Sequence, residues 1–345
     1  MISVLISAIK IIFLLGFLIG IHETGHFIVA KLCKVKVNEF AIGFGPTIWK
    51  KQGKETKYAI RLIPLGGFVS MEGEEEHSEE ERSFSNASIP KRIAIVLAGA
   101  TVNIIFAVIV YFGLSTSSEN YVLAKIGEIV PGYAAEQAGL QANDEIIKID
   151  GKKVRISSDV TRKIQNSQGN ELELLIKRDG EYKNIVLRPT LLESEGISAY
   201  FLGIIFKPES GNFSNRMYYA FWNTTDFIFS IADNVKQLFI GKVTADQMMG
   251  PVGISEVVVK TNGIREFVYM LALVSMSLGV TNLLPFPPLD GGKIVFLLIE
   301  AIRKKPIKQE TEAKIQLLGF AILITISFYI TYNEEYSKGG KSWKQ

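Results

Sequence analysis

Four long apolar segments constrain the fold of this chain more than any other feature. Each is long enough to cross the ~30 Å hydrocarbon core of a bilayer, and they cover residues 4–21, 93–114, 267–288 and 313–332. The hydrophobic share of the 345 residues, 48%, agrees with this reading. No small-residue cleavage site follows the first segment, so we expect a retained helix rather than a signal peptide. The sequence therefore predicts a polytopic α-helical membrane protein with about four transmembrane helices.

Net charge and cysteine content exclude other kinds of function. The net charge of +3 is small, and no basic stretch is interleaved with aromatic residues, so we expect no nucleic-acid partner. The single cysteine, Cys33, excludes an internal disulfide and a cysteine-based metal cluster. We expect Cys33 to be a small buried residue at the end of a helix.

Lysine and arginine residues near the ends of the apolar segments predict the orientation. They cluster after the first segment (Lys31, Lys34, Lys36), before the second (Lys91, Arg92) and between the third and fourth (Arg303, Lys304, Lys305, Lys308). Such clusters favour the cytoplasmic side of a membrane, so we expect the 37–88 and 303–308 loops there. The N-terminus, the stretch 116–262 and the C-terminus are then expected outside.

The chain after the first apolar segment contains strand-like runs. Residues 37–42 precede the breaker Gly43-Phe44-Gly45-Pro46, and residues 57–63 precede Pro64-Leu65-Gly66-Gly67. Residues 68–71 are expected to return along residues 57–63. This stretch therefore predicts one or two β-hairpins.

Three further stretches differ in character from the apolar segments. Residues 72–81 are acidic, so we expect a solvated loop in which His77 has no ligand role. Residues 122–190 alternate short β-rich runs with turns and predict a small globular domain between the second and third transmembrane helices. Residues 213–262 are rich in aromatic residues and suit an amphipathic helix at the membrane interface. A plain packing helix of the globular domain is the alternative.

The motif His22-Glu23-Thr24-Gly25-His26 is the strongest chemical signal in the chain. Histidines at i and i+4 share one face of a helix, so two imidazoles can converge on one tetrahedral zinc ion. The intervening Glu23 can act as the catalytic base toward water. The motif interrupts an apolar segment, where an ionisable group costs about 2.5–3.5 kcal/mol and rarely lies without a function.

A catalytic zinc site needs a third protein ligand and an open position for water. Asp290 meets this need better than His77, which lies in the acidic loop. On the predicted topology the first and third apolar segments both run from outside to inside, so His22, His26 and Asp290 reach a similar depth. Prolines in residues 282–292 prevent a continuous helix there, and irregular backbone is tolerated at membrane depth where it lines a cavity.

The whole chain resembles the bacterial site-2 protease family, in the branch with one periplasmic PDZ domain (the regulator-of-sigma-E protease type). The matching motifs come in the family's order, at residues 22–26, 44–46, 64–69, 250–254 and 282–291, and residues 122–190 resemble a PDZ core. The resemblance implies an intramembrane zinc metalloendopeptidase of the bacterial inner membrane. Its implied substrates are transmembrane proteins that have already been trimmed, such as anti-sigma factors or signal-peptide remnants.

The resemblance also implies the roles of the site residues. His22, His26 and Asp290 would bind zinc, and Glu23 would be the base. Asn282 matches the asparagine that contacts the substrate backbone or the developing oxyanion. Two alternatives are a membrane scaffold with a vestigial metal site and a zinc transporter. The intact Glu23 and Asp290 argue against the scaffold, and the apolar segments lack the series of ligands that a transporter would need.

Substrate binding and two departures from the family pattern complete the prediction. An extended substrate can be held by adding it to an open strand edge, and we expect the 57–71 hairpin, with Gly66 and Gly67, to supply that edge. Ala100 stands where the family usually has a proline. Only one PDZ-like unit fits the sequence, whereas some relatives carry two.

The sequence divides into seven expected parts, with membrane lipid around the helices. They are a first transmembrane helix with the zinc motif (1–34), cytoplasmic-side β-hairpins and an acidic loop (35–88), a second transmembrane helix (89–116), a PDZ-like domain (117–208), an amphipathic juxtamembrane region (209–262), a third transmembrane segment with the Leu-Asp-Gly motif (263–303), and a fourth transmembrane helix with a tail (304–345).

Overall fold

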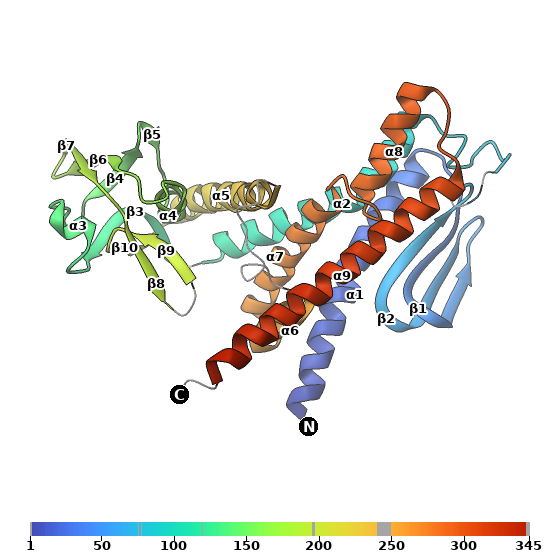
Figure 1. The fold of residues 1–345 in the computed structure, drawn as a ribbon, viewed down its shortest axis with the longest axis horizontal. Helices are drawn as coiled ribbons and strands as arrows, with labels where there is room; N and C mark the ends of the chain where they lie inside the picture. The colour runs from blue at the N-terminus through green and yellow to red at the C-terminus, as the bar shows by residue number, and fades with distance from the viewer. Residues whose placement is uncertain are drawn as a thin grey trace. The chain divides into compact units, whose positions relative to one another are not determined.

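A computed structural model of the chain describes residues 2–74, 76, 78–118, 120–194, 197–239 and 250–342. The chain forms two compact units. The first consists of Met1–Val110 and Gln237–Gln345, and the second of Tyr111–Lys236. Figure 1 labels the helices and strands of both units.

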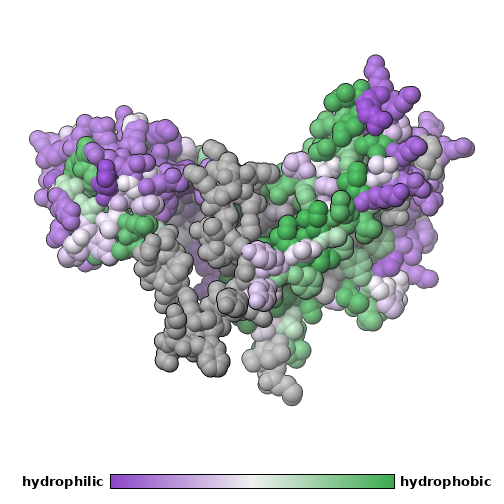
Figure 2. All heavy atoms as spheres, in the orientation of Figure 1, coloured by the Kyte–Doolittle hydropathy of each residue, from purple (hydrophilic) through white to green (hydrophobic). Residues whose placement is uncertain are grey.

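Among the described residues, four helices are long and apolar enough to cross a membrane. They are α1 (Ile2–Leu32), α2 (Ile89–Thr116), α7 (Ile264–Asn282) and α9 (Gln309–Ser342). Within α9 the candidate span is Gln309–Tyr332, and only 6% of its apolar 18-residue stretch is buried. Large apolar side chains therefore remain exposed on α9, and Figure 2 shows hydrophobic residues gathered along this helix. Such a surface suits lipid. Three of the predicted apolar segments lie wholly within helices, and the segment 267–288 is helical only to Asn282.

Two of these helices end at residues other than the ends of the predicted apolar segments. Helix α1 continues without a break to Leu32, so the His22–His26 motif lies inside the helix. Helix α7 ends at Asn282, and three prolines separate it from the shorter helix α8 (Asp290–Arg303). Proline has no backbone N–H to donate, so a helix cannot continue through such a stretch. A further helix, α6 (Pro251–Lys260), precedes α7.

Strands β1 (Val37–Gln52) and β2 (Lys57–Met71) form a two-stranded antiparallel sheet in the first unit. Both strands bend, so the first part of β1 has neighbours on two sides. Residues 37–42 pair with residues 67–71, from Val37–Met71 to Ile42–Gly67, and also with residues 57–60. Within the described chain, no further strand pairs with the outer side of residues 67–71.

The prediction that residues 68–71 return along residues 57–63 is therefore wrong. Both segments pair with β1 instead and lie on opposite sides of it. The bends that allow this arrangement lie at glycines with positive φ, namely Gly43 (88°), Gly45 (82°) and Gly66 (103°). Only glycine adopts such angles readily, so the family-like glycine motifs are turns within the sheet rather than ends of hairpins.

Two smaller predictions concern the edges of the first unit. Cys33 follows the end of α1 and is half-buried against a core that includes Ala30, Val37 and Ile95, rather than fully buried as expected. A turn begins at this residue. His77 lies outside the described residues.

The second unit is built around a sheet with the strand order β10-β3-β4-β6-β7, and β5 pairs with β4. Its strands are β3 (Asn120–Ile129), β4 (Glu145–Ile149), β5 (Lys152–Lys153), β6 (Leu172–Arg178), β7 (Glu181–Leu187) and β10 (Ile204–Ser210), and β8 (Thr190–Ser194) pairs separately with β9 (Ile197–Phe201). Helices α3 (Ala134–Gln137) and α4 (Ser157–Asn166) complete the unit's core. The sheet extends beyond the β-rich stretch 122–190, because β10 pairs with β3, and β10 ends two residues after the predicted domain boundary at residue 208.

Helix α5 (Phe213–Phe239) is the aromatic-rich segment predicted after this domain. One face packs on α4: Asp226 accepts a hydrogen bond from Arg162 at 2.6 Å, and the guanidinium of Arg155 lies 3.6 Å from the ring centre of Trp222. Other aromatic side chains, such as Phe221 and Phe229, are exposed. The helix is amphipathic, as expected, but its polar contacts belong to the globular unit.

Candidate metal centre

Helix α1 brings the two histidines of the motif onto one face. His22 and His26 are one turn apart, and their Nε2 atoms lie 3.1 Å from each other. His22 is 8% exposed, so the pair lies inside the helix bundle rather than on its surface. The predicted convergence of two imidazoles is therefore present in the structure.

Asp290, the first residue of α8, completes the group. Its Oδ2 lies 3.2 Å from His22 Nε2 and 3.6 Å from His26 Nε2. The two glycines that follow allow the irregular chain to fold tightly against the start of α8. A Cβ on Gly291 would overlap the carbonyl oxygen of Leu284, and one on Gly292 would lie 2.7 Å from Pro287 N. The Asp-Gly-Gly sequence thus holds the carboxylate in place.

These three donors fit a zinc ion. A tetrahedron with zinc–ligand bonds of ~2.0–2.1 Å has edges of about 3.3 Å, and the three distances between donors bracket that value. Asp290 Oδ2 is buried and has no hydrogen-bond partner in the described part of the chain, as expected for an oxygen that binds a cation. A nitrogen and oxygen donor set of this kind is one that zinc prefers.

Gly99 of α2 leaves the room that such an ion needs. A Cβ at this position would overlap His26 Nε2 and would lie 2.7 Å from His22 Cε1. Close packing of α1 on α2 requires a second glycine, because a Cβ on Gly25 would lie 2.5 Å from the carbonyl oxygen of Ala98. The neighbouring Ala100 is fully buried and α2 is unbroken there, so the missing proline does not interrupt the helix.

We expect Gly99→Ala to lower zinc affinity by about 100-fold, the upper end of the range for disturbed ligand orientation. The added methyl group would occupy space beside both imidazoles. Zinc affinity can be measured by competition with a chromophoric chelator. Gly113→Ala is the matched control on the same helix, because a Cβ there would have no atom within 4 Å. Equal affinities for the two variants would contradict this description of the site.

Helix α2 also contacts the outer nitrogens of both imidazoles. His26 Nδ1 lies 2.8 Å from the carbonyl oxygen of Ile95, to which it can donate, leaving Nε2 unprotonated for a metal. His22 Nδ1 lies 3.4 Å from Asn103 Nδ2. The sequence analysis missed Ile95 and Asn103. The i, i+4, i+8 spacing of Ile95, Gly99 and Asn103 matches that of the histidines and is the signal that could have identified them.

Glu23 lies beside the three donors without joining them. Its Cγ would be 3.4 Å from a Cβ on Gly67, so the side chain lies next to the sheet segment that has an open edge. Gly66, the preceding residue, has a positive φ, and a Cβ there would overlap the ring of Phe44. Asn282 is the last residue of α7, and no hydrogen bond joins it to the three donors in the described chain.

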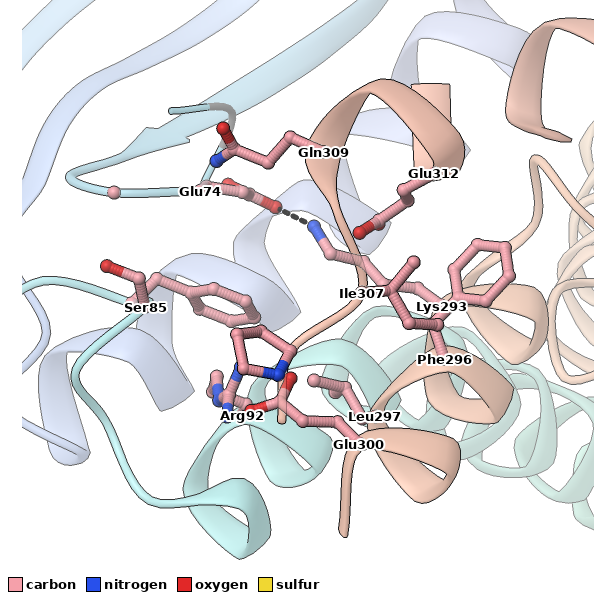
Figure 3. Close-up of a pocket in the computed structure, with 13 residues that line it drawn as sticks. Glu74, Ser85, Arg92, Lys293, Phe296, Leu297, Glu300, Ile307, Gln309 and Glu312 are labelled. Carbon is pink, nitrogen blue, oxygen red and sulfur yellow. Dashed lines mark hydrogen bonds and ion pairs between the residues drawn. The ribbon is translucent and has the colours of Figure 1, made fainter. Parts of the chain in front are cut away.

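Two ion pairs tie α8 to the rest of the unit. Lys293 donates to Glu74 at 2.6 Å, and Figure 3 shows these side chains pointing toward one another among the residues that line a cavity of about 470 Å³. Arg92 of α2, which lines the same cavity, pairs with Glu300 through both of its terminal nitrogens. Because Lys293 is one turn from Asp290, these contacts help to hold the carboxylate opposite the histidines.

Comparisons with known proteins agree with the geometry. Residues 10–326 match the model of Peptidase family M50. A Clostridium acetobutylicum protein named for zinc metalloprotease activity is 35% identical, over 92% of this chain and 94% of that protein. The regulator of sigma-W protease RasP from Bacillus subtilis is 28% identical, over 95% of this chain and 98% of its own.

One similar solved structure is the PDZ domain of the SdrC-like protein from Listeria monocytogenes. It has a TM-score of 0.21 and 18% identity, and the match covers 26% of this chain and 90% of that domain. This likeness is too limited to assign a fold. The PDZ-like domain therefore stays a prediction from the sequence.

Proposed function

The chain belongs to Peptidase family M50, and on that premise we propose that this zinc metalloprotease hydrolyses peptide bonds inside the membrane, within transmembrane segments of proteins that have already been trimmed. The observation that carries the proposal is the position of His22 and His26 within the candidate span Leu5–Leu32. Anti-sigma factors and signal-peptide remnants are the proposed substrate classes. The name of the Bacillus subtilis relative, a regulator of sigma-W, supports the first class.

In this proposal each site residue has one task. His22, His26 and Asp290 hold zinc through Nε2, Nε2 and Oδ2. Zinc, when bound, supplies the Lewis acidity that acidifies water and polarises the scissile carbonyl. Glu23 is outside the ligand set, so its carboxylate takes the proton of the attacking water and returns it to the leaving amide nitrogen.

Substrate would bind as an added strand along residues 67–71. A transmembrane helix shields its own peptide bonds, so the scissile segment must unwind, and an extended segment can pair with an open strand edge. The proximity of Gly67 to Glu23 supports this placement because a strand added there would run past the base. Gly66 and Gly67 are the proposed substrate contacts on the sheet, and Asn282 is the proposed contact for the substrate backbone or the oxyanion.

The proposal includes an orientation in the bacterial inner membrane. The lysine and arginine clusters favour a cytoplasmic 37–88 loop, with the second unit outside and the metal centre nearer the cytoplasmic side. In a Cys33→Ser background, we expect a membrane-impermeant thiol reagent to label Glu181→Cys in intact cells. It should label Glu76→Cys only after the cells are opened. Labelling of Glu76→Cys in intact cells would reverse the assignment.

The test of the function uses two substrates that share one transmembrane segment. One carries a large folded outer domain, and the other has been trimmed to a short outer tail. With the full-length protein in lipid vesicles, we expect cleavage of the trimmed substrate alone, because the second unit would exclude bulky outer domains. Mass spectrometry should place the cut within the apolar segment. A cut confined to the polar flanks would contradict intramembrane cleavage.

The matched control removes the β-sheet domain of the second unit, from β3 to β10, as a whole. Deletion of residues 120–210 takes out both β3 and β10, which pair with each other, and so leaves no unpaired strand of that sheet behind. This variant is expected to cleave both substrates. If the inserted variant cleaves neither, the domain has a structural role instead of selecting substrates.

A further inference from the structure

Asn103 is a polar residue buried in the middle of an apolar helix. Its exposed fraction is 0%, and its Oδ1 has no hydrogen-bond partner in the described chain. Its Nδ2 lies 3.4 Å from His22 Nδ1. A buried amide with an unpartnered oxygen is unfavourable unless the group serves a purpose. The adjacent imidazole indicates what that purpose is.

The proton on His22 determines which end of the amide should face it. An imidazole that binds a metal through Nε2 carries its proton on Nδ1, where it is a donor. The NH₂ group of an amide is also a donor, so the two groups cannot form a hydrogen bond. A half-turn about the last side-chain bond exchanges Oδ1 and Nδ2 within nearly the same shape. In either orientation of the amide, the atom that does not face His22 has no partner among the described residues. The proton on His22 Nδ1 therefore determines which orientation is favoured.

We propose that Asn103 is a positioning residue for the metal centre, whose Oδ1 accepts a hydrogen bond from His22 Nδ1 when zinc is bound. This contact holds the ring in the tautomer that presents Nε2 to the metal. The inference rests on the proposed zinc ligands. It adds a side chain from α2 to a group otherwise supplied by α1 and α8.

The partner of the second histidine supports this assignment. His26 Nδ1 faces the carbonyl oxygen of Ile95, which can only accept. Ile95, Gly99 and Asn103 follow one another at intervals of four along α2, and so lie on one face. That face therefore offers a backbone acceptor to His26, space at Gly99 and a side-chain acceptor to His22. Only at Asn103 does the acceptor depend on the identity of the side chain.

The backbone of Asn103 is fixed independently of His22. Ser275 of α7, itself fully buried, donates from Oγ to the Asn103 carbonyl oxygen at 2.9 Å. Helix α7 approaches closely here, because a Cβ on Gly279 would lie 2.8 Å from the carbonyl oxygen of Ala100. Helix α7 thus packs closely on α2 at this position, and Ser275 bonds the backbone of Asn103 rather than its side-chain amide.

The experiment compares Asn103→Leu with Asn103→Asp in the full-length protein in detergent. Leucine has a similar size but no acceptor, whereas aspartate keeps an acceptor at the same position. We expect Asn103→Leu to weaken zinc binding by about 10–100-fold, the usual effect of losing such a partner. Asn103→Asp should retain the affinity of the unsubstituted protein. Chelator competition gives the affinity, and the visible absorption of the Co²⁺-loaded protein reports the geometry of the ligands.

Ser275→Ala is the matched control, because it removes a buried hydrogen bond from the same helix contact without touching the amide. Its zinc affinity should not change. If Asn103→Leu does not insert into the membrane, Asn103→Ala replaces it, with the same expected loss. Unchanged affinity in Asn103→Leu, or equal losses in the Leu and Asp variants, would overturn the inference. Absence of zinc binding by the unsubstituted protein would instead reject the ligand set itself.

Discussion

Glu23→Gln is expected to lower the rate of cleavage of a transmembrane substrate by about 10²–10⁴-fold, the usual effect of losing a general base. Glutamine has nearly the same shape as glutamate but cannot take the proton of the attacking water. Zinc content should stay at the level of the unsubstituted protein, because the proposed donors are His22, His26 and Asp290. Cleavage is measured by separating intact and cut substrate, and zinc by elemental analysis of the same preparation.

The control for this result is Glu55→Gln. Glu55 is also a carboxylate of the first unit, but it pairs with Lys31 and Arg82 in the polar part of the sheet region. Its replacement should leave the cleavage rate unchanged. If Glu23→Gln cleaved at the normal rate with zinc bound, the assigned base would be wrong. If Glu23→Gln lost as much zinc as is expected for His22→Ala, Glu23 would be a zinc ligand or would support one.

Replacement of any of the three donors by alanine should remove zinc and activity together. We expect His22→Ala, His26→Ala and Asp290→Ala each to lose more zinc affinity than a variant that lacks only a hydrogen-bond partner of a ligand. Loss of such a partner lowers the affinity by about 10–100-fold. The reason is that a catalytic zinc site has only three protein ligands to begin with. Elemental analysis after dialysis against a weak chelator would measure it.

His77→Ala is the control for these variants, since His77 is the third and last histidine of the sequence. His77→Ala should retain zinc, because His77 was predicted to have no ligand role. A protein with Asp290→Ala that retained full zinc and activity would show that the third ligand is another residue. Zinc loss in His77→Ala would point to that histidine.

The sequence could indicate the helices and the close approach of His22 and His26 because both depend on local patterns. Apolar runs of membrane length identify spans by themselves, and the i, i+4 spacing places His22 and His26 on one helix face. Asp290 was reached by combining topology with the preference of zinc for three protein ligands. Each of these steps needs few long-range contacts.

The pairing within the β1–β2 sheet could not be predicted in the same way. Whether residues 67–71 lie beside residues 57–63 or beside residues 37–42 depends on how far the chain bends at Gly43 and Gly66. Glycine permits many bends without selecting one. Ile95 was missed for a related reason: it contributes a backbone oxygen, so its side chain carries no signal.

The position of the third donor on α8 has a consequence for the newly made protein. His26 and Asp290 are 264 positions apart (290 − 26) in the chain, so the ribosome adds the last donor long after the first two. At ~5–20 residues per second, the interval is roughly 13–53 s. During that time the nascent chain carries His22, Glu23 and His26 but lacks the third proposed donor. On this assignment, the metal site can be completed only once α8 is being made.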